Sequence, residues 1–139
     1  MKLFYLLFSA ALYVLSYSPF DYKILIFLSL VIFLKVIEDV SLTNKITYTF
    51  IYAFFIHALG VSWVSESLIT YGLMGLAGSI FVTVFFITIV SIPYILIALF
   101  HKPITKNGIY NINLIAVIFL AVEYIKSLFF GGFPWLLIG

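Results

Sequence analysis

The sequence predicts an all-α membrane protein with about five transmembrane helices, and its composition carries this prediction. Hydrophobic residues make up 65% of the 139 residues, charged residues only 9%, and the mean hydropathy is +1.30. A soluble domain carries about 25% charged residues because its surface must face water. A chain with so few charges cannot cover a globule with polar side chains. Its surface is therefore predicted to face lipid, and its main partner is predicted to be the phospholipid bilayer.

Five apolar segments are long enough to be predicted as spans, since a bilayer needs about 20 residues of helix, and fewer where flanking side chains snorkel. The predicted spans cover residues 2–17, 22–37, 44–63, 73–100 and 109–130 of a single domain, and an apolar turn is predicted over 131–139. The first span ends before Pro19, because proline disfavours helix in the residue before it. Its poor cleavage site indicates a retained helix rather than a signal peptide.

The lysines predict how these spans are oriented. With the N-terminus inside, the inner loops and ends carry Lys2, Lys35, Lys45, Lys102 and Lys106, and the outer ones carry Lys23 and Lys126. Cytoplasmic loops are enriched in basic residues, so the N-terminus is predicted inside and the C-terminus outside.

Several classes of site are not indicated by the sequence. The chain has no cysteine, which excludes disulfides, thiolate metal ligands and a cysteine nucleophile within it. The net charge of +2 gives no indication of nucleic-acid binding. There is no glycine-rich phosphate loop and no cluster of metal ligands. We therefore predict no catalytic, metal-binding or cofactor-binding residues.

Two polar side chains in the predicted fifth span are candidate functional residues. An ionisable residue inside a membrane segment is costly and marks a functional site by default, which singles out Glu123. Lys126 follows three residues later on the same helical face, so a structural ion pair is the competing interpretation. His57, alone in the third span, is interpreted as a hydrogen-bonded structural histidine.

The connection between the third and fourth spans supplies further candidates. Trp63 and Tyr71 are typical of the membrane interface, and with Glu66 they form either an anchoring belt or a lipid entrance on the outer side. Gly72 begins a group of small residues that permit close helix packing. Pro93 is predicted to kink the fourth span because it removes one backbone hydrogen bond.

The closing stretch FFGGFPWLLIG is predicted to form an apolar turn. Gly132 and Pro134 interrupt the helix, while Phe133 and Trp135 keep the turn apolar. Irregular backbone at membrane depth occurs only where protein covers it or where it lines a cavity. This turn is therefore expected to pack against other parts of the protein.

Three segments together resemble one known family. The first carries Ser18, Pro19 and Phe20, and the second carries Trp63, Ser67, Tyr71 and Gly72. The third carries Glu123, Tyr124, Lys126, Gly132, Phe133, Pro134, Trp135, Leu136 and Gly139. In this order they resemble the N-terminal membrane portion of apolipoprotein N-acyltransferase. Lys126 departs from the arginine common at its place in that family, and so lacks the bidentate fork of a guanidinium.

The resemblance implies a role in bacterial lipoprotein maturation at the inner (cytoplasmic) membrane, as a multi-pass protein. Family members transfer an acyl chain from a phospholipid to the N-terminal cysteine amine of a lipoprotein. They do so through a thioester on a nitrilase-like domain that uses Cys, Glu and Lys. That domain is absent from these 139 residues, so the chain is expected to be a truncated or split membrane portion without activity of its own, with a nitrilase-like domain and a lipoprotein as further partners.

Two other functions remain open on the sequence alone. One is a non-catalytic membrane protein that binds lipid or a partner. The other is a small transporter, which would need paired intramembrane charges on separate helices. Glu123 is the one good candidate for such a charge.

Overall fold

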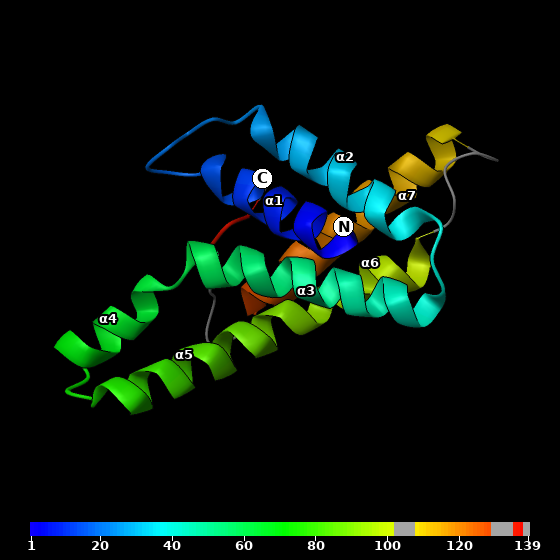
Figure 1. Cartoon of the computed structure of the whole chain (residues 1–139). Coiled ribbons are helices and arrows are strands. Elements are labelled where there is room, and N and C mark those ends of the chain that lie inside the picture. The colour runs from blue at the N-terminus through cyan, green and yellow to red at the C-terminus, as the bar shows by residue number, and fades with distance from the viewer. Residues whose placement is uncertain (102–107, 129–134, 138–139) are drawn as a thin grey trace.

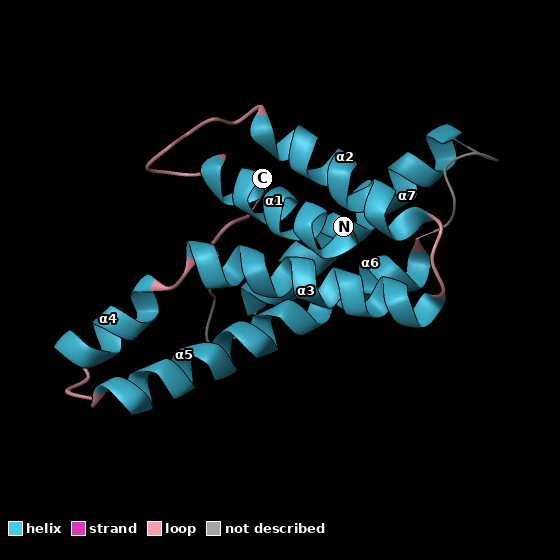
Figure 2. Cartoon of the chain, in the orientation of Figure 1, coloured by secondary structure: helices cyan, strands magenta, loops and turns pink. Residues whose placement is uncertain are grey.

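The computed structural model describes residues 1–101, 108–128 and 135–137, with only the backbone considered over 108–112. Every regular element in these residues is a helix, which confirms the all-α prediction (Figure 2). The elements are α1 (Lys2–Leu15), α2 (Leu25–Glu38), α3 (Leu42–Gly60), α4 (Trp63–Thr70), α5 (Leu76–Ser91), the 3₁₀ turn η1 (Ile92–Tyr94), α6 (Ile95–Phe100) and α7 (Gly108–Leu128).

The helices form a bundle with two distinct ends (Figure 1). α1 and α2 are an antiparallel hairpin that packs on α3, and α5, η1 and α6 run back along α3 on its other side. α7 packs on η1 and α6. The last turns of α1 and α3 therefore lie at the same end as residues 135–137, which we call the pocket end. α4 and the start of α5 extend beyond the other helices there.

Small hydroxyl residues let α1 and α2 approach closely in the buried core. The Ser9 hydroxyl donates to the Ser29 carbonyl at 2.7 Å, and the Ser29 hydroxyl donates to the Ser9 carbonyl at 2.7 Å. Tyr52 of α3 joins this pair, with its hydroxyl 2.8 Å from that of Ser29. The Tyr52 ring stacks on Phe33 with 4.2 Å between centroids. Small residues and interhelical hydrogen bonds are typical of packed membrane helices.

One described helical segment, Leu76–Phe100, is long and apolar enough to cross a membrane, with a mean hydropathy of 2.6 over its best window. A second qualifies only if α3 and α4, which are bent by 48° from one another, count as one span. α1 and α2 have 14 residues each, fewer than a full crossing needs. The count of five spans and their orientation stay predictions.

The structure differs from the predicted third span at its end. The prediction ran the helix through Trp63 and placed a polar break after it, whereas α3 ends at Gly60 and Trp63 begins α4. Val61 leaves the helical region with φ −128° and ψ 17°, and its amide still donates to the His57 carbonyl. The short α4 was missed because Ser65 and Glu66 make this segment polar.

The fourth predicted span contains the expected irregularity at Pro93. Proline has no amide hydrogen, so it cannot donate to the carbonyl of Ile89. The Ile92 amide takes this carbonyl instead, and Ile92–Tyr94 forms a 3₁₀ turn between α5 and α6. This turn places Tyr94 in the core, fully buried.

Candidate functional site

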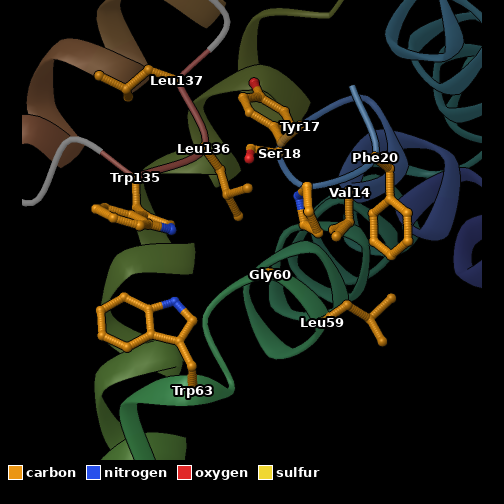
Figure 3. A pocket seen from close by; sticks show the side chains of 11 residues that line it. Val14, Tyr17, Ser18, Phe20, Leu59, Gly60, Trp63, Trp135, Leu136 and Leu137 are labelled. Carbon is orange, nitrogen blue, oxygen red and sulfur yellow. The ribbon is translucent and has the colours of Figure 1, made fainter. Parts of the chain in front are cut away.

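The pocket end of the bundle contains a cavity of about 660 Å³. Its lining residues come from the end of α1 and the loop after it, from the α3–α4 junction, and from the chain after α7: Val14, Tyr17, Ser18, Pro19, Phe20, Leu59, Gly60, Trp63, Trp135, Leu136 and Leu137 (Figure 3). None of these side chains is an acid, a lysine or a histidine. Cavities of this size and apolar character are typical of small-molecule sites. We call it the Trp pocket.

Two tryptophans form one wall of the Trp pocket. The indole rings of Trp63 and Trp135 face each other with 5.3 Å between centroids and 55° between planes (Figure 3). Each remains about half exposed, at 45% and 47%. A tilted aromatic pair at this separation is favourable beyond its buried area. The two residues are far apart in the sequence, so the pair joins the start of α4 to the end of the described chain.

Leu136 forms the floor between this wall and α3. Its side chain is 7% exposed and packs directly over the last residue of α3, Gly60 (Figure 3). The backbone of Leu136 has φ 56°, in the left-handed region that a leucine rarely adopts. Its neighbours must therefore hold this conformation in place.

Lys126 of α7 is the main contact behind the turn. Its side chain is fully buried, and the ammonium donates to the carbonyls of Trp135 at 2.9 Å and Leu136 at 3.3 Å. It also donates to the Tyr94 hydroxyl at 3.4 Å. Glu123, one helical turn earlier on α7, also acts on the ammonium as a nearby opposite charge, so these hydrogen bonds add to the predicted attraction between the two side chains.

Two tyrosines at the end of α1 and just after it also contact this turn, and one of them donates to the Leu136 carbonyl. The Tyr13 hydroxyl donates to the Leu136 carbonyl at 3.3 Å. The Tyr17 hydroxyl donates in turn to that of Tyr13 at 3.3 Å, and Tyr17 lines the Trp pocket. Tyr13 lies in the last turn of α1, and Tyr17 lies two residues beyond the end of that helix.

A second cavity, of about 400 Å³, adjoins the Trp pocket and is more polar. The two cavities share Tyr17, Ser18 and Leu137, and the second one also includes the charged side chains of Asp21 and Lys23. An apolar cavity is thus continued by one that carries both signs of charge.

The other predicted site residues lie elsewhere or outside the described residues. Glu66 is on the exposed side of α4, where the Thr70 hydroxyl donates to it at 3.3 Å. Tyr71 caps α4 and is 85% exposed, and Gly72 follows it in the α4–α5 turn; neither lines the Trp pocket. Glu123 lines a separate apolar cavity of about 400 Å³ between α2 and α7. The predicted residues Gly132, Phe133 and Pro134 lie outside the described residues.

His57 has the structural role that was predicted for it. Its Nδ1 lies 2.8 Å from the Ala53 carbonyl and 3.1 Å from the Ser91 hydroxyl, which itself donates to Ile87 at 2.7 Å. Because both neighbouring oxygens serve as acceptors there, the network places the proton on Nδ1. The ring packs edge-on against Tyr94 with 5.5 Å between centroids.

Sequence reasoning missed several residues that build the site: Gly60, Tyr13, Tyr17 and Tyr94. The four-residue spacing of Tyr13 and Tyr17 was a readable signal, as was a glycine at the end of an apolar helix. Nothing local in the sequence indicates that these residues meet Trp135. Pro19, Trp63 and Trp135 were predicted, and the structure brings all three into one cavity.

A family model for the apolipoprotein N-acyltransferase N-terminal domain matches residues 9–139. The chain belongs to this family. It is 30% identical over 132 residues to the apolipoprotein N-acyltransferase of Haemophilus influenzae, a match that covers 94% of this chain and 24% of that protein. It is 28% identical over 138 residues to that of Pasteurella multocida, covering 98% of this chain and 26% of that protein. The chain therefore spans about a quarter of the length of these curated relatives.

Membership of the N-acyltransferase family connects the three sequence segments to one place in the fold. The matched residues begin in α1 and run to the end of the chain, so they include every segment that lines the Trp pocket. Pro19, Trp63 and Trp135 are thus parts of a single cavity rather than three separate features.

Proposed function

We propose that this chain forms the membrane portion of an apolipoprotein N-acyltransferase and that its Trp pocket receives an acyl chain of the phospholipid donor. The observation that carries the proposal is the convergence of Pro19, Trp63 and Trp135 on one cavity at one end of the bundle. The chain itself holds no cysteine, so the thioester chemistry belongs to a nitrilase-like domain. The role of this portion is to hold the lipid and present its ester.

The two adjoining cavities match the two parts of a phospholipid. None of the described residues that line the Trp pocket is an acid, a lysine or a histidine, which favours a hydrocarbon chain over a charged group. The neighbouring cavity contains Asp21 and Lys23, whose carboxylate and ammonium complement the opposite charges of a zwitterionic headgroup. A lipid lying across both would place its ester near Tyr17, Ser18 and Leu137, the residues that the two cavities share.

In this proposal the pocket end faces the outer side of the inner membrane, and the chain crosses the membrane several times. The distribution of lysines supports this orientation, because Lys2, Lys35 and Lys45 are not among the residues that line the Trp pocket. Lys2 donates to the Val36 carbonyl at 3.4 Å at the far end of the α1–α2 hairpin. Basic residues favour the cytoplasmic side. A lipoprotein substrate would then meet the lipid at the outer surface.

A chimera tests the proposal directly. Residues 1–139 replace the matched N-terminal region of the Haemophilus influenzae relative, and the chimera is expressed in a bacterium depleted of its own enzyme. The expected result is an amide-linked acyl chain on the N-terminal cysteine of a reporter lipoprotein, measured by mass spectrometry. The matched control carries a serine in place of the relative's catalytic cysteine and is expected to give no product.

The proposal fails if the chimera reaches the membrane at the level of the intact relative and yields no amide-linked chain. Binding of phospholipid without acylation would then favour the alternative that the sequence left open, a non-catalytic lipid-binding protein.

A further inference from the structure

We propose that Lys126 is a positioning residue, whose buried ammonium fixes the Trp135–Leu136 turn and thereby sets the place of Trp135 in the wall of the Trp pocket. Lys126 does not line the pocket and so has no contact with an occupant there. This inference rests on the proposed function only in taking a phospholipid acyl chain as that occupant.

The ammonium of Lys126 can donate only a fixed number of hydrogen bonds. A lysine ammonium has three donors and no acceptor. In this structure it meets three oxygens, the carbonyls of Trp135 and Leu136 and the hydroxyl of Tyr94. Burial of a charge is tolerated where it is paired and hydrogen-bonded. The described contacts of the ammonium therefore satisfy its donors and direct most of them to the turn.

The backbone of the Trp135–Leu136 turn has an unusual conformation at Leu136. Two successive carbonyls can point at one donor here because Leu136 adopts φ 56°. A left-handed conformation is unfavourable for leucine, so contacts with neighbouring residues must stabilise it. The ammonium contacts both carbonyls, whereas the Tyr13 hydroxyl contacts only that of Leu136. Lys126 is thus the contact that spans both residues of the turn.

The Trp135–Leu136 turn connects Lys126 to the Trp pocket, because both turn residues line that pocket. The same two residues whose carbonyls face Lys126 direct their side chains the other way, with Leu136 over Gly60 and Trp135 opposite Trp63 (Figure 3). Loss of the ammonium releases the carbonyls and lets the left-handed residue relax. Relaxation of Leu136 shifts the adjoining Trp135 and opens the wall.

The chain offers an intrinsic probe for this effect, because its only two tryptophans are Trp63 and Trp135. Two indoles 5.3 Å apart couple their electronic transitions, so the circular dichroism of the full chain in phospholipid nanodiscs carries an exciton couplet from this pair. Quenching of their fluorescence by lipid brominated on its acyl chains reports occupancy of the pocket.

The test compares Lys126→Met, which keeps the length and loses the charge, with Lys126→Arg, which keeps donors for the carbonyls. Lys126→Met is expected to abolish the couplet and to weaken binding of brominated lipid by about tenfold. Lys126→Arg is expected to restore both. The matched control is Lys45→Met, which removes another buried lysine, one bonded to His101 away from the pocket, and is expected to leave couplet and quenching unchanged.

A folded Lys126→Met chain that keeps the couplet and the lipid affinity of the unaltered chain overturns the inference. If that chain does not fold, Lys126→Gln is the second variant, with one neutral donor group and an expected partial couplet. Failure of both to fold, with Lys45→Met folded, shows that Lys126 supports the whole bundle and rejects the positioning role. Loss of the couplet in a chain whose chimera shows no acylation leaves the positioning role standing and the proposed function rejected.

Discussion

Gly60 and Leu136 are in such close contact that a side chain at the glycine would force the end of the Leu136 side chain to move. A Cβ built on Gly60 would overlap Cδ1 of Leu136 and lie 3.1 Å from its Cδ2 and 3.2 Å from its Cγ. These atoms belong to a buried side chain whose backbone is held by Lys126. Because Gly60 has no side chain, Leu136 can pack closely against the junction of α3 and α4.

Gly60→Ala is therefore expected to destabilise the fold. Overpacking a buried contact costs about 1–3 kcal/mol, and we expect the free energy of unfolding to decrease by an amount in this range. Chemical denaturation in detergent micelles measures it. Gly78→Ala is the matched control, since its nearest atom is the Met74 methyl at 3.6 Å and alanine favours helix, so it is expected to raise stability by up to about 1 kcal/mol. Equal effects of the two variants would contradict the close contact.

Ser29→Ala is expected to weaken the α1–α2–α3 core. The Ser29 hydroxyl is bonded both to the Ser9 carbonyl and to the Tyr52 hydroxyl, all of them buried. Its removal leaves buried polar groups with fewer partners, which costs about 1–3 kcal/mol. Denaturation of the variant measures the loss. The control Thr47→Ala removes an exposed hydroxyl bonded within its own helix and is expected to change stability by less than about 0.5 kcal/mol.

The helical class could be predicted from the sequence because it depends on composition, which is a property of the whole chain. Helix ends were less predictable where the local signals were weak. At the break between α3 and α4, Gly60 packs against Leu136, a residue 76 positions later, and this contact could not be read from the local sequence. Pro93 was predictable because its effect on the backbone is local.

The site was predictable in its membership but not in its assembly. Pro19, Trp63 and Trp135 stood out as interfacial or turn residues, yet their meeting depends on the fold of the whole bundle. The sequence predicted that Lys126 pairs with Glu123, because Glu123 is the nearest opposite charge on the same helical face. The contacts of Lys126 with the carbonyls of Trp135 and Leu136 were not predicted, because no sequence pattern indicates where such a left-handed turn will lie.

The stability of the fold is expected to depend on pH through His101, which lies at the end of α6 and is 5% exposed. Burial and the Lys45 ammonium, whose Nζ is 3.4 Å from Nδ1, lower the pKa of His101 below its ordinary value of 6.5, while Glu38 opposes them. Well above pH 6.5 the imidazole is neutral in both the folded and the unfolded chain, so it contributes nothing to the pH dependence of the free energy of unfolding. Below it the unfolded chain takes up the proton first, so the free energy of unfolding falls.

Denaturation between about pH 7 and pH 5 measures this slope, which for one group is at most about 1.4 kcal/mol per pH unit. His101→Gln removes the titrating group, so its stability is expected to vary less over this interval. A variant that keeps the full slope would assign the effect to other groups.

Brominated phospholipid is expected to quench the fluorescence of the chain through both tryptophans if an acyl chain enters the Trp pocket. Trp63→Phe and Trp135→Phe each leave one indole, so each variant reports one side of the same wall. Because the two rings are in contact across one cavity, bromine at a given acyl position should quench them to a similar extent. Leu59 of α3 lines the same cavity and is about half exposed, so Leu59→Phe, which fills more of the cavity, should reduce quenching in both variants together. Strong quenching of one indole with none of the other, or no response to the filling substitution, would place the lipid outside the cavity.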